Sequence, residues 1–354
     1  MNSEELMYEY PINRINIEDY IIKNFSLIDF ERCNISILLD FLLSKESGIN
    51  RICLVGTPYG LLLYLLYVGD FTNTLFVFYG NYPLIDAISK LRNYGVVCLC
   101  VSNDKLTKHE NTVNQCLVDY ISSNLSQFAI DVYGQDTAPI ISNFINDNFA
   151  LFEDGRISYI SREDANRTNG FHVNIYDVGI KKIIYTGLEE IPSDLKKIAH
   201  IISIEEYWNR LSQTRQAEIM EIFGFSPFRL KEIIMSGRDT ILFTRNYSKV
   251  GKCSEFDHVQ MYKEILSHYN LNNVIIKPHP NDDVIYEDYF KDCVVLPKKM
   301  PAELIWLNKL PIKTVVSVDA SSNIFGTFKG KIKVDLYPDM LRKYHVIRTR
   351  KEMP

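Results

Sequence analysis

Short apolar runs of four or five residues recur along the chain, each bounded by glycine, proline or polar residues. Such runs predict strands that are buried on both faces of a parallel sheet. Longer segments between them predict helices, and the strand–helix alternation predicts a doubly wound α/β fold. The pattern predicts strands at residues 52–55, 74–79, 96–101, 127–133, 149–152, 183–186 and 201–204, and helices at 58–68, 83–92, 110–125 and 139–147.

A second alternation begins near Asp239, after helical material that extends to about Phe223. We place a domain boundary within residues 225–238, so that residues 1–235 and 236–354 each form a Rossmann-like domain. Two doubly wound domains in series describe the GT-B arrangement, in which the domains face each other across a cleft. The second alternation predicts strands at 240–244, 274–277, 294–296 and 314–318, and helices at 256–268 and 301–307.

Composition narrows the class of protein. A hydrophobic content of 46% and a charged content of 23% are ordinary for a globular protein and exclude a disordered or fibrous one. The net charge of -5 gives no basic face for nucleic acid. Seven cysteines without a CxxC pair favour a reducing cytoplasm over a disulfide framework. The polar start of the chain and the short apolar stretch at 61–68 predict neither a signal peptide nor a membrane span.

The end of the chain is the exception to this balanced charge, because basic residues cluster there with few acids. A solvated terminal helix explains the cluster, and attraction to anionic lipid or an acidic glycan is the alternative. Peripheral membrane contact through this segment and homodimerisation are therefore two partner hypotheses. The basic residues are Lys329, Lys331, Lys333, Arg342, Lys343, Arg348, Arg350 and Lys351.

Two polar signatures follow predicted strands in different halves of the chain. Glu153-Asp154-Gly155 follows the run at 149–152, and Lys277-Pro278-His279-Pro280 follows the run at 273–276. Ligands of open α/β sheets bind outside the carboxyl ends of the strands. The sequence therefore predicts a carboxylate and a histidine that face one another across a substrate site.

Glu153 and Asp154 form a candidate catalytic acid pair, in which Asp154 is the first candidate for the general base and Glu153 is the alternative. Like charge from Glu153 would raise the pKa of a neighbouring carboxylate, which suits a base, and Gly155 allows backbone and substrate to approach closely. A polar turn without function explains the same three residues. Gly56 and Thr57, in the turn after the first strand, join Gly155 as candidate contacts to the donor or acceptor sugar.

His279 lies between two prolines that stiffen its backbone, so its imidazole can be aimed without a helix. With Lys277 and Pro280 it suits the binding or protonation of a phosphate oxygen on a leaving group. A capped core histidine is the alternative.

Three further residues suit nucleotide binding. Ser321 and Ser322 precede a possible helix start and predict an anion site, although an ordinary N-cap also explains them. Glu303 lies in the first turn of its predicted helix. We expect its carboxylate either to accept hydrogen bonds from ribose hydroxyls or merely to interact favourably with the helix dipole. The sequence contains no Asp-x-Asp, so a metal-bridged sugar diphosphate donor is not supported, and we expect no metal site.

Glu153-Asp154-Gly155, His279-Pro280 and Ser321-Ser322, in this order and spacing, resemble the motif series of bacterial GT-B sialyltransferases. These are the lipooligosaccharide and capsule enzymes of glycosyltransferase family 52 and, more distantly, the bacterial polysialyltransferases. The resemblance covers roughly residues 51 to 330.

The resemblance implies an inverting transfer of sialic acid from CMP-sialic acid to a hydroxyl of an acceptor glycan, without a metal or other cofactor. By the resemblance, Asp154 deprotonates the acceptor and His279 binds or protonates the departing CMP phosphate. Ser321 and Ser322 hold that phosphate, and Glu303 holds the cytidine ribose. The resemblance also makes the N-terminal domain the acceptor side and the C-terminal domain the nucleotide side.

Three other functions compete with this interpretation. A CDP-glycerol-type glycerophosphotransferase also uses a His-Pro strand end and a double serine, although Glu153-Asp154-Gly155 argues for sialyl transfer. Transfer of a related acid such as Kdo from its CMP donor is a nearer neighbour. A catalytically silent glycan-binding protein on the same scaffold is the alternative from a different class.

Overall fold

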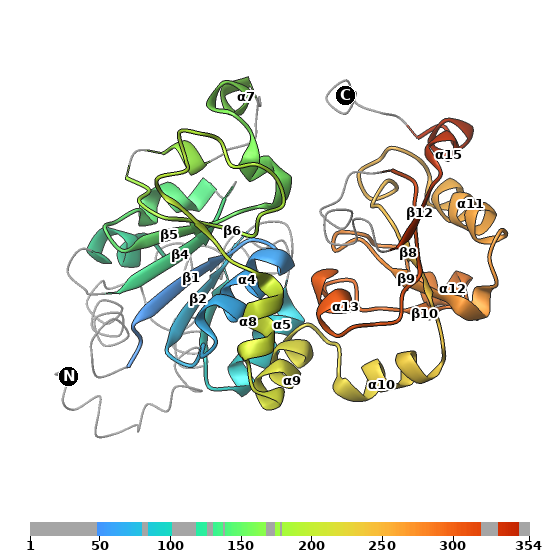
Figure 1. Cartoon of the computed structure of the whole chain (residues 1–354), viewed down its shortest axis with the longest axis horizontal. Helices are drawn as coiled ribbons and strands as arrows, with labels where there is room; N and C mark the ends of the chain where they lie inside the picture. The colour runs from blue at the N-terminus through green and yellow to red at the C-terminus, as the bar shows by residue number, and fades with distance from the viewer. Residues whose placement is uncertain are drawn as a thin grey trace, which may run out of the picture. The chain divides into compact units, whose positions relative to one another are not determined.

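The computed structural model describes residues 48–79, 84–100, 118–125, 130–136, 139–167, 174–177, 179–319 and 332–346. The chain divides into two compact units, Met1–Ile222 and Phe223–Pro354. Each unit contains one parallel sheet flanked by helices (Figure 1). The segment at 225–238, which we predicted to hold the domain boundary, contains the helix α10 (Pro227–Met235).

The first unit is built on a seven-stranded sheet in which all neighbouring strands are parallel. Its described strands are β1 (Arg51–Val55), β2 (Thr74–Phe78), β3 (Val97–Cys100), β4 (Asp131–Gln135), β5 (Phe149–Phe152), β6 (Ile183–Tyr185) and β7 (Ala199–Ile201). Its described helices are α4 (Pro58–Val68), α5 (Ile85–Asn93), α7 (Arg162–Arg167), α8 (Ile204–Arg210) and α9 (Gln213–Ile222), with 3₁₀ turns η4 (Pro139–Phe144), η5 (Gly155–Tyr159) and η6 (Asn174–Tyr176).

The second unit is built on a five-stranded sheet, also parallel throughout. Its described strands are β8 (Thr240–Phe243), β9 (Val274–Lys277), β10 (Val294–Val295), β11 (Thr314–Ser317) and β12 (Lys333–Leu336). Besides α10, its described helices are α11 (Glu255–Leu266), α12 (Tyr286–Tyr289), α13 (Glu303–Leu307) and α15 (Pro338–Lys343), with a 3₁₀ turn η7 (Leu271–Asn273).

Both sheets reverse their direction of growth once. The first sheet has the order β3-β2-β1-β4-β5-β6-β7, and the second has the order β10-β9-β8-β11-β12. In the first unit, β2 and β3 are added on one side of β1, and β4 is then added on its other side. In the second unit the same reversal lies between β8 and β11. Such switch points open a crevice at the carboxyl ends of the strands, where ligands bind in doubly wound folds.

Most predicted elements are present, and the predicted doubly wound parallel α/β class is confirmed. The strand predicted at 201–204 is wrong in position, because β7 ends at Ile201 and Ser203 already caps α8. The strand predicted at 127–133 lies later, at Asp131–Gln135. The helix predicted at 139–147 is a shorter 3₁₀ turn. The sequence interpretation also missed β12, whose residues are mostly exposed and therefore lack an apolar run.

Local sequence explains why α4 begins directly after β1. The Thr57 side chain accepts a hydrogen bond from the Gly60 backbone N–H at 3.1 Å, and Pro58 occupies the first helical position. Gly69 ends the helix with a φ of 67°, a left-handed conformation that glycine adopts without strain. The helix packs on β1, β4 and β5, so Thr57 is fixed at the switch point of the first sheet.

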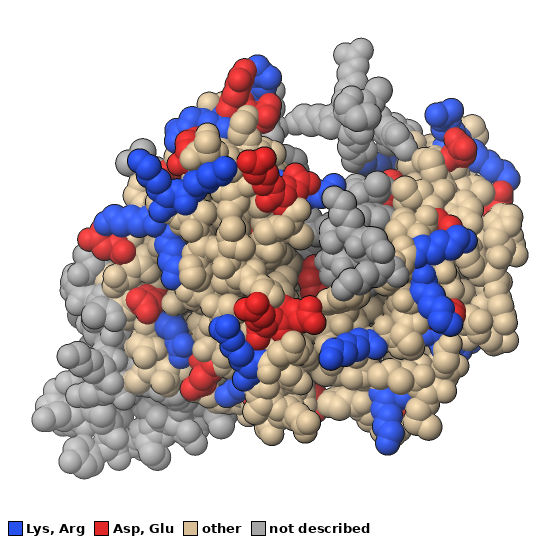
Figure 2. All heavy atoms as spheres, viewed as in Figure 1, with Lys and Arg blue, Asp and Glu red and all other residues tan. Residues whose placement is uncertain are grey.

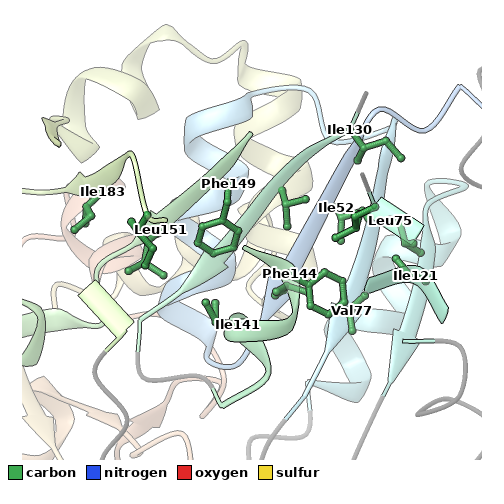
Figure 3. Close-up of a cluster of buried hydrophobic side chains, with 14 of the residues drawn as sticks. Ile52, Leu75, Val77, Ile121, Ile130, Ile141, Phe144, Phe149, Leu151 and Ile183 are labelled. Atoms are coloured by element: carbon green, nitrogen blue, oxygen red, sulfur yellow. The ribbon is translucent and has the colours of Figure 1, made fainter. Parts of the chain in front are cut away.

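The first sheet is covered on one face by a core of branched aliphatic and aromatic side chains (Figure 3). Ile52, Leu75 and Leu151 lie on three of its strands and are fully buried. Phe144 from η4 and Ile121 from residues 118–125 cover them from the side. These contacts hold the central strands in register and so fix the positions of their carboxyl ends.

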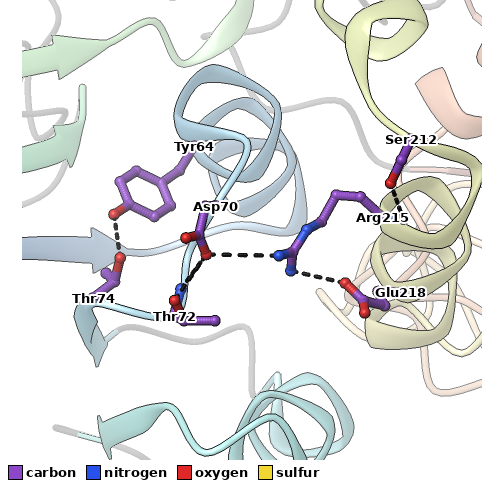
Figure 4. A network of polar contacts seen from close by, with 7 residues as sticks. All are labelled: Tyr64, Asp70, Thr72, Thr74, Ser212, Arg215 and Glu218. Atoms are coloured by element: carbon purple, nitrogen blue, oxygen red, sulfur yellow. Dashed lines mark hydrogen bonds and ion pairs between the residues drawn. The ribbon is translucent and has the colours of Figure 1, made fainter.

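Helix α9 is tied to the end of α4 by a polar network (Figure 4). Arg215 forms ion pairs with Asp70 at 3.6 Å and with Glu218 at 2.8 Å, and its guanidinium lies over the Phe71 ring. Hydrogen bonds from Thr72 are the main cause of a lowered pKa of Asp70. The last helix of the first unit is therefore anchored to the loop between α4 and β2.

The described surface carries mixed charge. In Figure 2 basic and acidic side chains are interspersed over the visible face of both units. Two members of the basic C-terminal cluster have acidic partners, since Lys333 pairs with Asp335 and Lys343 pairs with Glu264. Arg342 also lies within α15; Lys329, Lys331, Arg348, Arg350 and Lys351 lie outside the described residues. None of the helices in the described part of the chain has both the length and the apolar character needed to span a bilayer.

We expect Leu151→Ala to destabilise the first unit by about 2–5 kcal/mol, because it opens a cavity beneath the strand that carries the acidic signature. Chemical denaturation followed by circular dichroism measures the change. Ile201→Ala, on a strand residue that is 63% exposed, is the matched control and should change stability by no more than about 0.5 kcal/mol. Equal effects of both variants would contradict the assignment of the core.

Candidate active site

The carboxyl ends of β1, β4 and β5 gather polar side chains at the switch point of the first sheet. Thr57 follows β1, Gln135 ends β4, and Glu153 and Asp154 follow β5. The parallel register pairs Gln135 with Phe152, so the Gln135 side chain lies beside the acidic signature. The structure thus places Gly56, Thr57, Glu153, Asp154 and Gly155 at one edge of one sheet.

Glu153 is fully buried and surrounded by hydrogen-bond donors. Tyr59 donates to Oε1 at 2.6 Å, and Tyr159 donates to Oε2. The hydroxyl and the backbone N–H of Thr186, after β6, also donate to this carboxylate. With both oxygens occupied by protein donors, Glu153 joins α4, η5 and the end of β6, which is the role of a structural carboxylate.

Asp154 is only partly buried and points to different partners. Gln135 Nε2 donates to Asp154 Oδ1 at 2.7 Å, and the Asp154 backbone N–H donates to Ser158 Oγ at 2.7 Å. Ser158 in turn donates to Asp136, a buried carboxylate at the end of β4. The geometry therefore favours Asp154 over Glu153 as the carboxylate available to a substrate.

Packing at Gly56 and backbone conformation at Gly155 both require glycine at this edge. A Cβ on Gly56 would lie 2.8 Å from the Tyr79 ring, so only glycine fits beneath that phenol. Gly155 has a φ of 64°, which begins η5 in a conformation that favours glycine. Burial, and then the nearby Asp154 charge, raise the pKa of Tyr79 far above its ordinary value, so the phenol stays protonated.

In the second unit, His279 lies just beyond β9 in a loop held by backbone and side-chain contacts. The His279 backbone N–H donates to Thr244 Oγ1 at 3.1 Å, and the Asn281 N–H donates to His279 Nδ1 at 3.1 Å. Thr244 and Tyr286 both donate to the Asp282 carboxylate, which secures the loop from below. A neutral imidazole that accepts at Nδ1 carries its proton on Nε2.

Burial is the main cause that lowers the pKa of His279 to about 3, and the charges of Arg245, Lys277 and Lys299 lower it further. Asp319 acts in the opposite direction. At neutral pH the side chain is therefore an uncharged Nε2–H donor in a cationic setting. Such a setting favours a bound anion, because a phosphate would meet both the donor and the positive field.

Lys277 does not present its ammonium group for phosphate binding. Its side chain is buried, and Nζ donates to the backbone carbonyls of Pro278 at 2.6 Å and Lys298 at 3.0 Å. Burial lowers the pKa of Lys277 to about 7, opposed by the Glu303 charge. Our prediction of direct phosphate contact at Lys277 is corrected to a role in fixing the loops after β9 and β10.

Two further predicted residues of the second unit, Pro280 and Glu303, lie at the same edge. Pro280 follows His279 in the loop. Glu303 begins α13, and its negative charge acts to raise the pKa of Lys277. Ser321 and Ser322 lie outside the described residues, directly beyond Asp319. Asp319 follows β11, accepts a hydrogen bond from Tyr247 at 2.8 Å and pairs with Arg245 at 3.7 Å.

Sequence reasoning missed Gln135, Asp136, Thr244 and Arg245 as parts of these edges. A signal was present, because Gln135 and Asp136 lie at the carboxyl end of β4, and Thr244 and Arg245 follow β8. Both strands lie at switch points of their sheets. Ligands of open α/β sheets bind at the carboxyl ends of the strands, and a search of every predicted strand end for polar residues would have found these four. Ser158 and Asp282 carried no such signal, since only the folded loops bring them under the signatures.

We expect ¹⁵N NMR to show His279 as the neutral Nε2–H form from pH 8 down to about pH 4, because its pKa lies near 3. Saturating CMP should raise that pKa, since a phosphate charge stabilises the imidazolium. His268, an exposed histidine just beyond α11, is the internal control, and its ring signals should not respond to CMP. A His279 that titrates near 6.5 in the free protein would contradict the buried environment.

Solved structures with a similar fold are bacterial sialyltransferases. A 2,6-sialyltransferase of Photobacterium sp. JT-ISH-224, solved with the donor product CMP and the acceptor substrate lactose, matches with a TM-score of 0.55 and 11% identity over 81% of this chain and 70% of that chain. The GT-B domain of a Photobacterium damselae sialyltransferase matches with a TM-score of 0.52 and 13% identity, covering 80% and 89% of the two chains. The likeness shows the GT-B fold that the sequence predicted.

A protein of Haemophilus influenzae, described as uncharacterized, is 25% identical over 221 residues, which cover 60% of this chain and 71% of that protein. The model of glycosyltransferase family 52 matches residues 80–337 and so includes both signatures and the described strands from β3 to β12. The family resemblance drawn from the motifs is confirmed. This chain belongs to glycosyltransferase family 52.

Proposed function

We propose that this protein is an inverting sialyltransferase, which moves sialic acid from CMP-sialic acid to a hydroxyl of an acceptor glycan. Family membership supports glycosyl transfer, and the fold matches enzymes that perform sialyl transfer. The observation that carries the proposal is the pair of strand ends. One presents an oriented carboxylate, Asp154, and the other presents a neutral imidazole, His279, among cations.

The proposed chemistry begins with the acceptor hydroxyl. Asp154 accepts its proton while the oxygen attacks the anomeric carbon of sialic acid. The bond between that carbon and the phosphate oxygen breaks, and CMP leaves. His279 donates a hydrogen bond from Nε2 to the phosphate, and Arg245 supplies positive charge beside it. Attack from the side opposite to the leaving phosphate inverts the configuration.

Other parts of the proposal follow from the resemblance and stay predictions. Glu303 binds the cytidine ribose, and Ser321 with Ser322 binds the phosphate. No metal takes part, because the donor carries a single phosphate. The acceptor is a lipooligosaccharide or capsular polysaccharide, and the reaction takes place in the cytoplasm. Peripheral membrane contact and homodimerisation likewise stay predictions.

We expect Asp154→Ala and His279→Ala each to lower turnover at least about 100-fold, the usual scale of acid–base catalysis. Release of CMP from CMP-sialic acid measures the rate, with a chelator present in a parallel series that should leave it unchanged. Asp147→Ala and His268→Ala, both at exposed positions, are the matched controls. A rate near that of the parent in either test variant removes that residue from the mechanism.

We expect calorimetry to show selective binding of CMP over CDP and UDP, because a cationic edge with one histidine donor suits a single phosphate. Turnover of CMP-sialic acid, CMP-Kdo and CDP-glycerol then separates the candidate donors. Turnover of CDP-glycerol alone would establish the glycerophosphotransferase alternative. Nucleotide binding without turnover of any donor would favour the silent glycan-binding alternative.

A further inference from the structure

Gln135 is a polar side chain that the mechanism above does not use, although it touches the proposed base. It ends β4, is 2% exposed, and lies between Thr57 and Asp154. A buried amide at a switch point requires partners for both its oxygen and its nitrogen. The contacts with Thr57 and Asp154 supply one of each.

The contacts fix which way the amide points. Thr57 Oγ1 accepts from the Gly60 N–H, so its own proton is free to be donated to Gln135 Oε1 at 2.9 Å. Gln135 Nε2 then donates to Asp154 Oδ1 at 2.7 Å. The reversed amide would place its oxygen against a carboxylate oxygen, and these two acceptors would repel each other. The N-cap of α4 thereby orients the amide toward the carboxylate.

The backbone of α4 leaves room for this arrangement. A Cβ on Gly60 would lie 2.3 Å from Gln135 Oε1 and 2.6 Å from its amide carbon. A side chain at position 60 would displace the amide from both partners. The glycine, the cap and the amide therefore form one unit that ends at Asp154.

We propose that Gln135 is a positioning residue, which aims the Asp154 carboxylate and holds it ionised through the Nε2–H donor. The inference rests on the proposed role of Asp154 as the base. It assigns Thr57 to orienting this amide, in addition to the predicted sugar contact.

The charges around Asp154 show why a donor is needed there. Among the described residues, the titratable groups on neighbouring elements are mostly acidic or phenolic: Glu153 on the same strand end, Asp136 at the end of β4, and Tyr79 after β2, with Tyr59 of α4 behind Glu153. Arg156 of η5 pairs with Glu189 at 3.0 Å. Nearby acids raise the pKa of a carboxylate, and a donated hydrogen bond lowers it.

The test is Gln135→Glu, which keeps the size of the side chain and replaces the donor with a second carboxylate. Two carboxylates at this distance titrate as a coupled pair, so the pKa of Asp154 should rise by about 1 unit or more. Carbon-13 NMR of labelled aspartate, assigned with Asp154→Asn, measures it directly. The acidic limb of the kcat/KM profile should move to higher pH by the same amount, because the base must be ionised.

Two further variants separate positioning from folding. Gln135→Met removes the donor without adding charge; it should raise the pKa of Asp154 and lower kcat by up to about 100-fold, since misplacement of a reacting group has that scale. Gln213→Glu makes the same charge change at an exposed site on α9 and should move neither readout.

An unchanged Asp154 pKa in both Gln135→Glu and Gln135→Met would overturn the inference. So would a uniform loss of rate without movement of the acidic limb. Loss of turnover in Asp154→Asn beside such a result leaves the proposed function standing and removes Gln135 alone. Retained turnover in Asp154→Asn instead removes the proposed base, while the NMR titration still decides whether Gln135 controls its ionisation.

Discussion

Parallel pairing is the constraint on which the described chemistry depends. Every strand in both sheets runs in the same direction as its neighbours, so all carboxyl ends within a sheet lie at one edge. Residues from positions 57, 135 and 154 therefore meet through short hydrogen bonds although the chain separates them widely. Antiparallel pairing at any of these strands would send its polar end to the opposite edge. The apolar runs that fill both sheets enforce this pairing, because only burial on both faces satisfies them.

Each edge combines a rigid support with one partly buried group. In the first unit the buried carboxylates Glu153 and Asp136 are satisfied by hydroxyl and backbone donors, and Asp154 remains partly accessible. In the second unit the buried Lys277 donates to backbone carbonyls and the buried Asp282 accepts from hydroxyls. His279 remains partly accessible. Buried charge is costly unless it is fully paired, so these supports are stiff. Within its own unit, each stiff support holds one group in a defined orientation, Asp154 in the first and His279 in the second.

Much of the fold was predictable, because apolar runs and glycine or proline bounds report strands directly. β5 and β9 were found with correct bounds for this reason, whereas β12 was missed because solvent reaches most of its residues. The signatures after β5 and β9 were predictable from their place at strand ends. The direction of each side chain was not. Lys277 and Glu153 look available in the sequence, and only tertiary packing turns them inward.

The adjacency of Glu153 and Asp154 has a consequence for how this edge tolerates change. The backbone leaves the extended conformation at Asp154, with φ -110° and ψ 59°, where the turn η5 begins. Glu153 therefore enters the interior while Asp154 stays partly accessible. A slip of β5 by a single residue would exchange their environments, burying the accessible acid and stranding the other away from its tyrosines. Each acid of the neighbouring pair therefore has its proper environment only when β5 is aligned with β4 and β6 in the observed register.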